Sequence, residues 1–127
     1  MNLNQITIPS ISVEKTADFY KTLGLLLIVE AYPRYARFEC PIGGTTFSIH
    51  LVEELPKGNG IMIYFEVNDV AEKISEFQKN EITIDEMPEI KRWLWTEASL
   101  KDPDGNKIII YHAGVNRKTP PWRINKE

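Results

Sequence analysis

Hydrophobic and polar residues alternate along several short segments of this chain and follow a helical spacing along two others. A period of two residues predicts a strand, because successive side chains of a strand point to opposite faces. A spacing of three and four residues predicts one buried face of a helix. The segments predicted as strands are residues 5–9, 25–30, 35–40, 45–52, 61–66, 81–84, 93–101 and 107–112.

The first predicted helix follows the first strand. Val13, Ala17 and Tyr20 fall on one face of it, which is the spacing of a buried stripe. Ser12 is a suitable N-cap residue, and Gly24 suits the left-handed conformation that often ends a helix.

The second predicted helix begins after Asp69, which is followed three residues later by Glu72 in the spacing of a helix start. Asn80 is expected to end it. Its buried stripe is expected to consist of Val70, Ile74 and Phe77.

The chain repeats itself. Residues 14–21 (EKTADFYK) and 72–79 (EKISEFQK) share Glu, Lys, Phe and Lys in the same spacing and have an acidic residue at a fifth position, and each segment follows one strand and precedes three. We therefore predict an α+β fold in which two βαβββ modules, residues 1–54 and 55–112, form curled mixed sheets around a cleft. Residues 113–127 form a tail, and the 127-residue length favours a single domain.

Charge and composition argue against nucleic acid and membranes as partners. The net charge is -3 with both signs interspersed, so no basic stripe is present for nucleic acid. The longest aliphatic run, residues 25–29, is too short for a membrane span, and residues 1–10 lack a leader pattern. We expect a cytoplasmic protein, and the single cysteine, Cys40, fits a reducing compartment.

The order βαβββ twice, with FYKTLGL after the first strand and DPDGN before the last, resembles the vicinal oxygen chelate superfamily, which includes glyoxalases, extradiol dioxygenases and bleomycin-resistance proteins. The resemblance covers residues 5–111. It implies incomplete sheets curled around a cleft and, often, a homodimer. A homodimer is also expected because open sheets leave unpaired edges.

Metal-using members of that superfamily hold an ion with four side chains, and the resemblance assigns these positions to Gln5, His50, Met62 and Ile109. The family pattern has His where Met62 stands and Glu where Ile109 stands. Gln5 and His50 are the remaining candidate ligands, and a divalent ion needs three or more N, O or thiolate ligands. We predict no metal, with a divalent metal at Gln5 and His50 as the alternative.

The strand faces that point away from the helices predict a partly apolar small-molecule site in the cleft. His50 is its candidate acid or base, because imidazole titrates near neutrality. Equally, the same side chains could form a polar interior that satisfies its own hydrogen bonds. The predicted ligand-binding residues are Gln5, Thr7, Ser48, His50, Met62, Tyr64, Trp95, Ile109 and Tyr111.

Several aromatic and basic residues have two interpretations. Trp93 and Trp95, two residues apart, could stack a planar ligand or cover the edge of the core. The pairs Tyr32 with Tyr35 and Arg34 with Arg37 could bind a carboxylate or phosphate, or form a solvated strand face. Trp122 in the tail is expected to pack on this chain or on a partner.

Two functions follow from the resemblance. One is a metal-independent protein that binds a planar, partly apolar organic ligand, similar to the bleomycin-resistance branch. The other is a metal-dependent lyase, isomerase or dioxygenase that acts on a substrate with vicinal oxygens. Metal content separates the two functions.

Overall fold

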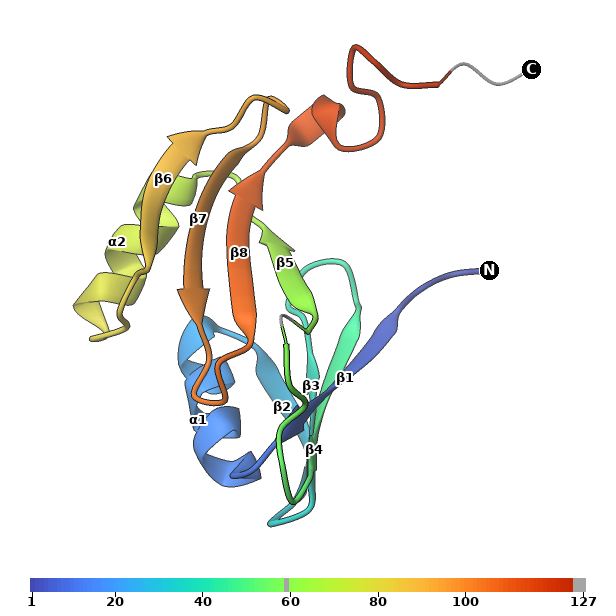
Figure 1. Cartoon of the computed structure of the whole chain (residues 1–127), viewed down its shortest axis with the longest axis vertical. Helices are drawn as coiled ribbons and strands as arrows, with labels where there is room; N and C mark the ends of the chain where they lie inside the picture. The colour runs from blue at the N-terminus through green and yellow to red at the C-terminus, as the bar shows by residue number, and fades with distance from the viewer. Residues whose placement is uncertain (59, 125–127) are drawn as a thin grey trace. The chain divides into compact units, whose positions relative to one another are not determined.

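The computed structural model describes residues 1–58 and 60–124, which form two modules with the same element order (Figure 1). The first module contains β1 (Gln5–Ser10), α1 (Val13–Leu23), β2 (Leu26–Ala31), β3 (Tyr35–Glu39) and β4 (Thr46–Leu51). The second contains β5 (Met62–Glu66), α2 (Val70–Lys79), β6 (Glu86–Ile90), β7 (Thr96–Lys101) and β8 (Lys107–His112), followed by the short 3-10 helix η1 (Gly114–Asn116). The predicted α+β fold of two βαβββ modules is confirmed.

The two sheets have the same topology. Their strand orders are β1-β4-β3-β2 and β5-β8-β7-β6. In each sheet the first strand pairs in parallel with the last strand of the module, and the remaining pairs are antiparallel. A mixed sheet with this order has the strand that precedes the helix at one edge.

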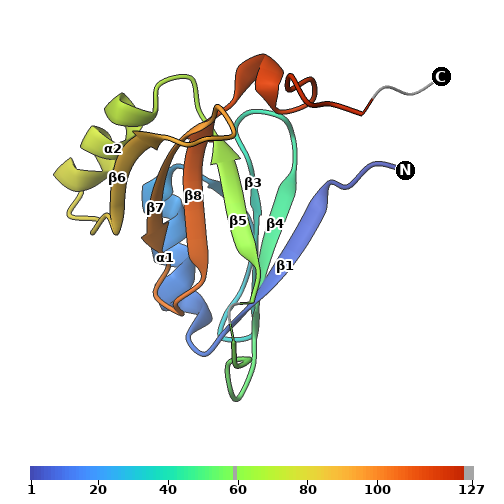
Figure 2. The ribbon, with the colours of Figure 1, turned by 45° about the horizontal axis from the view of Figure 1, so that its top comes forward.

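A buried apolar face lies under the helix of each module. In the first, Tyr20 of α1 lies against Phe47, with ring centroids 4.7 Å apart, and against Phe38 at 6.3 Å. In the second, α2 packs along one face of β6, β7 and β8 (Figure 2). Its stripe of Val70, Ile74 and Phe77 is buried, as the helical spacing predicts.

The chain divides into two compact units. The first comprises Met1–Gly60 together with Asp102–Asn106, the tip of the β7–β8 hairpin, and the second comprises Ile61–Lys101 and Lys107–Glu127. Hydrogen bonds explain why the hairpin tip belongs to the first unit. Tyr20 Oη donates to Asp102 Oδ2 at 2.7 Å, and Thr16 Oγ1 donates to Asp104 Oδ2 at 2.5 Å.

The helix ends follow the sequence closely. α1 begins directly after Ser12, although the Ser12 side chain makes no capping hydrogen bond, and ends at Gly24 with a φ of 112°. α2 begins after Asp69, whose side chain accepts a hydrogen bond from the Glu72 backbone N at 3.0 Å. Asn80 is the residue that follows the helix, but the left-handed conformation belongs to Glu81, with a φ of 63°.

The strand predicted at residues 81–84 is wrong, because the sixth strand is Glu86–Ile90. The backbone N–H groups of Glu81 and Ile82 donate to the carbonyls of Gln78 and Phe77 at the end of α2, so they are not free for a sheet. The true strand contains Pro88, and it is tolerated because β6 is an edge strand with a bulge between Glu86 and Glu89.

The strand predicted at 93–101 begins only at Thr96. The preceding residues form the β6–β7 turn, in which Leu94 has a φ of 72° and its backbone N donates to the Lys91 carbonyl at 2.9 Å. Trp93 therefore lies in the turn, where strand alternation does not relate it to Trp95.

The tail and the helices complete the description. Trp122 is 58% exposed, so the described part of this chain leaves most of its side chain uncovered, and packing on a partner stays a prediction. Among the described residues, neither helix is long and apolar enough to span a bilayer.

Candidate functional site

The face of the first sheet opposite α1 is polar. Phe47 and Ile49 of β4 are buried, so Thr46, Ser48 and His50, which alternate with them, point away from that core. The pairing places other polar side chains beside them. Across the sheet, Gln5 lies opposite Thr46, Thr7 and Arg37 lie opposite Ser48, and Tyr35 lies opposite His50.

Hydrogen bonds join these side chains into one chain of contacts. Gln5 Nε2 donates to Ser48 Oγ at 2.9 Å and to Thr7 Oγ1 at 3.2 Å, while Thr46 Oγ1 donates to Gln5 Oε1. Ser48 Oγ and Tyr35 Oη share a hydrogen bond of 2.6 Å. The structure thus brings three predicted ligand-binding residues, Gln5, Thr7 and Ser48, into direct contact.

Tyr35 has an unusual electrostatic setting in this network. Arg37 Nε donates to Tyr35 Oη at 2.8 Å, and the guanidinium carbon lies 5.5 Å from the centre of the Tyr35 ring. Partial burial acts to raise the pKa of Tyr35, but the hydrogen bonds from Ser48 and Arg37 and the charge of Arg37 outweigh it. The pKa of Tyr35 is therefore lowered.

His50 lies on the same face but outside the network. It is exposed, with Pro9 and Tyr35 as its neighbours across the strands. Within the part of the chain that the structure describes, its imidazole makes no hydrogen bond. The polar interior proposed for this residue does not hold, and His50 is accessible to solutes.

The corresponding face of the second sheet is aromatic. Trp95 stacks on Tyr111 with ring centroids 4.8 Å apart and an interplanar angle of 22°. Tyr64 meets both rings edge-on, at 6.2 Å from Trp95 and 5.6 Å from Tyr111. Tyr111 is buried, whereas Tyr64 is 42% exposed and Trp95 is half-buried. We call these three residues the aromatic cluster.

A buried carboxylate accompanies the aromatic cluster. Glu97 is only 7% exposed and lies directly opposite Tyr111 on β8. Trp93 Nε1 donates to Glu97 Oε2 at 2.6 Å, and Trp95 Nε1 donates to the Asn116 carbonyl at 3.2 Å. The two indoles thus have separate partners. Burial and the charge of Glu97 raise the pKa of Tyr64.

The two remaining predicted residues are less suited to binding polar groups. Ile109 is 4% exposed and lies between Tyr64 and Ser99 in the sheet. It packs with Tyr111 and Ala113 in an apolar cluster to which Trp95 also contributes. Met62, at the edge strand, is 50% exposed. Both supply apolar surface.

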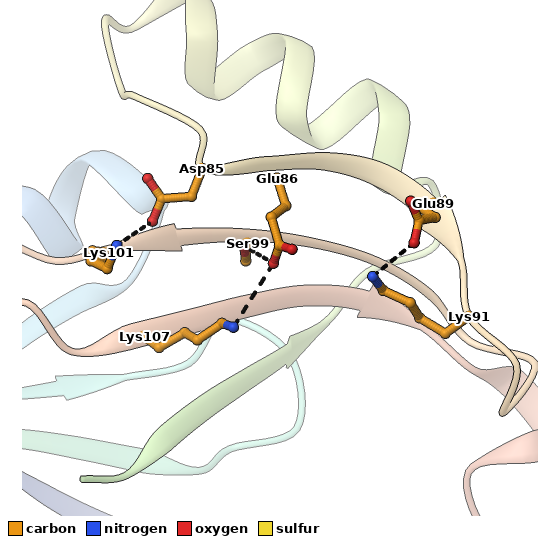
Figure 3. Close-up of polar contacts among 7 residues, drawn as sticks. All are labelled: Asp85, Glu86, Glu89, Lys91, Ser99, Lys101 and Lys107. Atoms are coloured by element: carbon orange, nitrogen blue, oxygen red, sulfur yellow. Dashed lines mark hydrogen bonds and ion pairs between the residues drawn. The ribbon is translucent and has the colours of Figure 1, made fainter. Parts of the chain in front are cut away.

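The end of the second sheet away from the aromatic cluster carries paired charges (Figure 3). Lys101 and Lys107 lie opposite each other, and Asp85 pairs with Lys101 at 3.1 Å while Glu86 pairs with Lys107 at 3.8 Å. Glu86 also accepts a hydrogen bond from Ser99 at 2.7 Å. Each of these two pairs neutralises its own charges. A third pair, Glu89 with Lys91 at 3.0 Å, lies at the other end of β6, where Glu89 is opposite Glu97. The aromatic cluster is the uncharged part of this face.

The residues present do not fit a divalent metal. Gln5 pairs with Thr46 whereas His50 pairs with Pro9, so the two candidate ligands are four positions apart along parallel strands. At about 3.3 Å per residue their backbones are roughly 13 Å apart, too far to share one ion. Among residues 1–58 and 60–124, no three His, Cys, Asp or Glu side chains gather closely enough to hold a metal.

Sequence reasoning missed how Tyr35 and Glu97 are placed. The alternation along residues 35–40 puts Tyr35 and Arg37 on one face, but only the β3–β4 register brings them to Ser48. The sequence did not show which face of the sheet Glu97 takes, because a shift of one residue in strand pairing exchanges the two faces. The pairing of Glu97 with Tyr111 in β8 decides it.

Of the comparisons with known proteins, the family model identifies a family. The family model described as Glyoxalase/Bleomycin resistance protein/Dioxygenase superfamily matches residues 2–110. No curated protein matches the chain significantly.

Solved structures share the fold at low sequence identity. A lactoylglutathione lyase from Agrobacterium tumefaciens has a TM-score of 0.74 at 16% identity, over 90% of this chain and 95% of that one. A superfamily member from Sphaerobacter thermophilus DSM 20745 has a TM-score of 0.72 at 24% identity, over 88% and 97%. A bleomycin-binding protein complexed with bleomycin has a TM-score of 0.72 at 21% identity, over 88% and 98%.

Proposed function

This chain belongs to the Glyoxalase/Bleomycin resistance protein/Dioxygenase superfamily, and from that premise we propose that it binds a small, planar, partly apolar organic molecule without a metal. The observation that carries the proposal is the aromatic cluster. Trp95, held against Tyr111 and flanked by Tyr64, is a rigid aromatic surface that remains partly open.

Stacking explains why a planar guest suits this surface. Offset or edge-on ring pairs stabilise a complex by about 0.5–1.5 kcal/mol each beyond the burial of their area. Because the indole N–H of Trp95 is already bonded to Asn116 and the ring is stacked, little side-chain freedom is lost on binding. Met62 and Ile109 would add apolar contact, and Glu97 would accept a hydrogen bond from a donor on the guest.

The polar face of the first sheet is a second part of the proposal. Gln5 and Thr7 present exposed hydrogen-bonding groups, the fully buried Ser48 holds Gln5 in place, and His50 is exposed on the same face. These groups would bind polar substituents of an organic ligand. One solved relative was crystallised with bleomycin, which supports small-molecule binding as a capacity of this fold.

The metal-dependent reaction is not retained. It requires ligands that converge, and the register separates Gln5 from His50 while Met62 and Ile109 are poor donors for a hard ion. Elemental analysis that finds about one equivalent of Zn, Ni, Fe or Mn per chain, lost in a His50→Ala variant, would overturn this proposal and favour the enzyme.

Assembly and location remain predictions. The outer strands of the sheets, β1 and β2 in the first and β5 and β6 in the second, have one unpaired edge each within the described residues. We propose that a homodimer protects part of these edges, and light scattering at tens of micromolar protein tests it. The cytoplasmic location predicted from the sequence also stays a proposal.

The binding experiment uses a panel of planar heteroaromatic compounds, with tryptophan fluorescence and ligand-observed NMR as the measurements. Compounds that bind the wild-type protein should lose binding at least tenfold in Trp95→Ala. They should retain it in Trp122→Phe, because Trp122 lies in the tail and is 58% exposed. Equal binding by both variants contradicts the assignment of the aromatic cluster.

A further inference from the structure

A second ligand-binding feature lies on β3 and does not depend on the aromatic cluster. Tyr35 Oη has two close neighbours, Arg37 Nε at 2.8 Å and Ser48 Oγ at 2.6 Å. Arg37 can only donate, so the direction of the first hydrogen bond is fixed. The second hydrogen bond depends on where the proton of Ser48 points.

The surroundings of Ser48 determine which atom its hydroxyl proton is donated to. Ser48 is fully buried, and its oxygen already accepts a hydrogen bond from Gln5 Nε2. The amide of Gln5 is oriented by the Ile6 carbonyl, which can only accept and lies 3.1 Å from Gln5 Nε2. Among residues 1–58 and 60–124, Tyr35 Oη is the only acceptor within hydrogen-bonding distance of the Ser48 hydroxyl. A buried hydroxyl proton without an acceptor is costly, so Ser48 donates to Tyr35.

The phenol of Tyr35 then accepts two hydrogen bonds and has one proton left to donate. The two acceptor positions of its oxygen are filled by Arg37 and Ser48, so this proton points away from the network. Arg37 uses only its Nε in this contact and is exposed, which leaves its two terminal NH₂ groups beside the same phenol. An O–H donor next to a guanidinium matches the two oxygens of a carboxylate.

We propose that Tyr35 and Arg37 form an anchor for the carboxylate of a small organic acid, with Ser48 as the residue that positions the phenol. One carboxylate oxygen accepts the Tyr35 proton, and the other accepts from a terminal nitrogen of Arg37. This anchor lies on the first sheet, whereas the proposed stacking surface lies on the second, so each can fail without the other.

The charges around the anchor favour a singly charged anion. On β3, Arg37 supplies one positive charge and Glu39, two residues further on the same face, supplies a negative one. On β4 the ionisable neighbour is His50, directly opposite Tyr35, and on β2 the residues opposite Tyr35 and Arg37 are Ala31 and Val29. A phosphate dianion would bring a second charge with no further cation from these strands.

The tyrosines offer a direct readout. The chain has five tyrosines. Burial and nearby carboxylates raise the pKa of four of them, while the pKa of Tyr35 is lowered. The four are Tyr20, Tyr32, Tyr64 and Tyr111. Phenolate absorbs in the ultraviolet where phenol does not. The first phenolate to appear with rising pH should therefore be that of Tyr35.

The first experiment is an ultraviolet pH titration of the full chain. The first transition should disappear in Tyr35→Phe and move to higher pH in Arg37→Gln and in Ser48→Ala. It should remain the first transition in Trp122→Phe, which lies in the tail and outside both proposed binding faces. If Tyr35→Phe keeps the first transition, or Arg37→Gln leaves it unmoved, the geometry assigned to the phenol is wrong.

The second experiment repeats the titration with benzoate and with its uncharged analogue benzamide. A bound carboxylate needs the phenol proton and repels a phenolate, so benzoate should raise the midpoint of the first transition. Benzamide should not change it. Arg37→Gln should weaken the benzoate effect about tenfold, as expected for the loss of a charge-assisted hydrogen bond.

Four outcomes would overturn the anchor. Three of them are an equal effect of benzoate and benzamide, a benzoate effect that persists at full strength in Arg37→Gln, and a stronger effect of inorganic phosphate than of benzoate. Circular dichroism spectra of the variants check that each is folded. Loss of the benzoate effect in Trp95→Ala would also count against it, because the anchor would then depend on the second sheet.

Discussion

The two modules pair their strands in the same register but carry chemically different side chains at equivalent positions. Parallel pairing begins at the first residue of the first strand in each module, with Gln5 opposite Thr46 and Met62 opposite Lys107. Ser48 and Ile109 therefore occupy equivalent positions. Ser48 is a link in a hydrogen-bonded network, whereas Ile109 packs beneath aromatic rings. Duplication has preserved the register and has left the exposed faces free to diverge.

The helices differ in the same sense. The buried stripe of α2 is wholly apolar, whereas that of α1 includes Tyr20, whose hydroxyl donates to the buried carboxylate of Asp102. Burial, and then the charge of Asp102, raise the pKa of Tyr20 far above its usual range. A buried hydrogen bond between Tyr20 and Asp102 thus stabilises the first compact unit, whereas α2 in the second packs through apolar side chains alone.

Asp102→Ala should give the largest loss of stability. Asp102 is 5% exposed and accepts from Tyr20 Oη, from Asn106 Nδ2 and from the backbone N of Asp104 and Asn106. Its removal leaves the buried Tyr20 hydroxyl unpaired and releases the turn. We expect the free energy of unfolding in urea to fall by about 3 kcal/mol.

A matched variant on the exposed surface supplies the control. Asp85→Ala removes a carboxylate that pairs with Lys101 at 3.1 Å, with side chains 35% and 60% exposed. We expect a change within about 0.5 kcal/mol. A double-mutant cycle with Tyr20→Phe should show coupling above about 1 kcal/mol. Equal losses in the two aspartate variants contradict the stabilising role of Asp102.

Trp95→Ala should cause the next largest loss of stability, and it tests the aromatic cluster of the second module. It removes the stack on Tyr111 and the hydrogen bond to Asn116, and it exposes Tyr111. We expect a loss of about 2 kcal/mol in urea unfolding, less than for a fully buried indole because Trp95 is half-buried. Trp122→Ala is the control, because Trp122 is 58% exposed within the described chain; where light scattering shows a monomer, it should change stability by less than about 0.5 kcal/mol. A larger effect there means that Trp122 packs on a partner.

The sequence predicts the scaffold better than the chemistry. Alternation and helical spacing locate both helices and most strands, because burial on one face leaves a period in the residues themselves. The strand expected at 81–84 is wrong because Glu81, which carries no sequence signal for a turn, adopts a left-handed conformation directly after Asn80, the residue expected to end the helix.

The candidate site depends on how neighbouring strands are aligned, and this alignment cannot be derived from the pattern of residues within each strand. Gln5, Ser48 and Tyr35 lie on three strands, and only their register brings the side chains within hydrogen-bonding distance. The expected pair of metal ligands, Gln5 and His50, was placed by family pattern, and the same register separates them.

Exchanging Gln5 and Met62, which occupy equivalent positions, tests directly whether the two faces have diverged. Gln5→Met removes the donor to Ser48 Oγ and the acceptor for Thr46, so we expect a loss of about 1 kcal/mol. Met62→Gln should change stability by less than about 0.5 kcal/mol, because Met62 is 50% exposed. Urea unfolding measures both. Equal effects in the two variants would show that the polar network does not depend on Gln5.

The smallest expected effect is local and depends on pH. Pro9 of β1 and Glu66 of β5 occupy equivalent positions. Of the two, only Glu66 has a side chain that can accept hydrogen bonds from the segment after β8. It accepts hydrogen bonds from the backbone N of Ala113 at 2.8 Å and of Gly114 at 3.0 Å, at the start of η1. Burial opposes its ionisation, but these bonds, with the nearby His112 and Arg117, outweigh burial and lower its pKa.

A lowered pKa means that Glu66 stabilises the fold fully above its ordinary value of 4.5 and loses this contribution as the pH falls below it through the lowered value. Hydrogen exchange of the Ala113 and Gly114 amides, followed by NMR, should therefore show protection that declines only on acidification below that point. The change should be under about 1 kcal/mol, because the site is partly exposed. In Glu66→Gln the amide oxygen still accepts but cannot ionise, so protection should be weaker and free of this acid transition. A transition that persists in Glu66→Gln would assign the effect to another group and remove this difference between the modules.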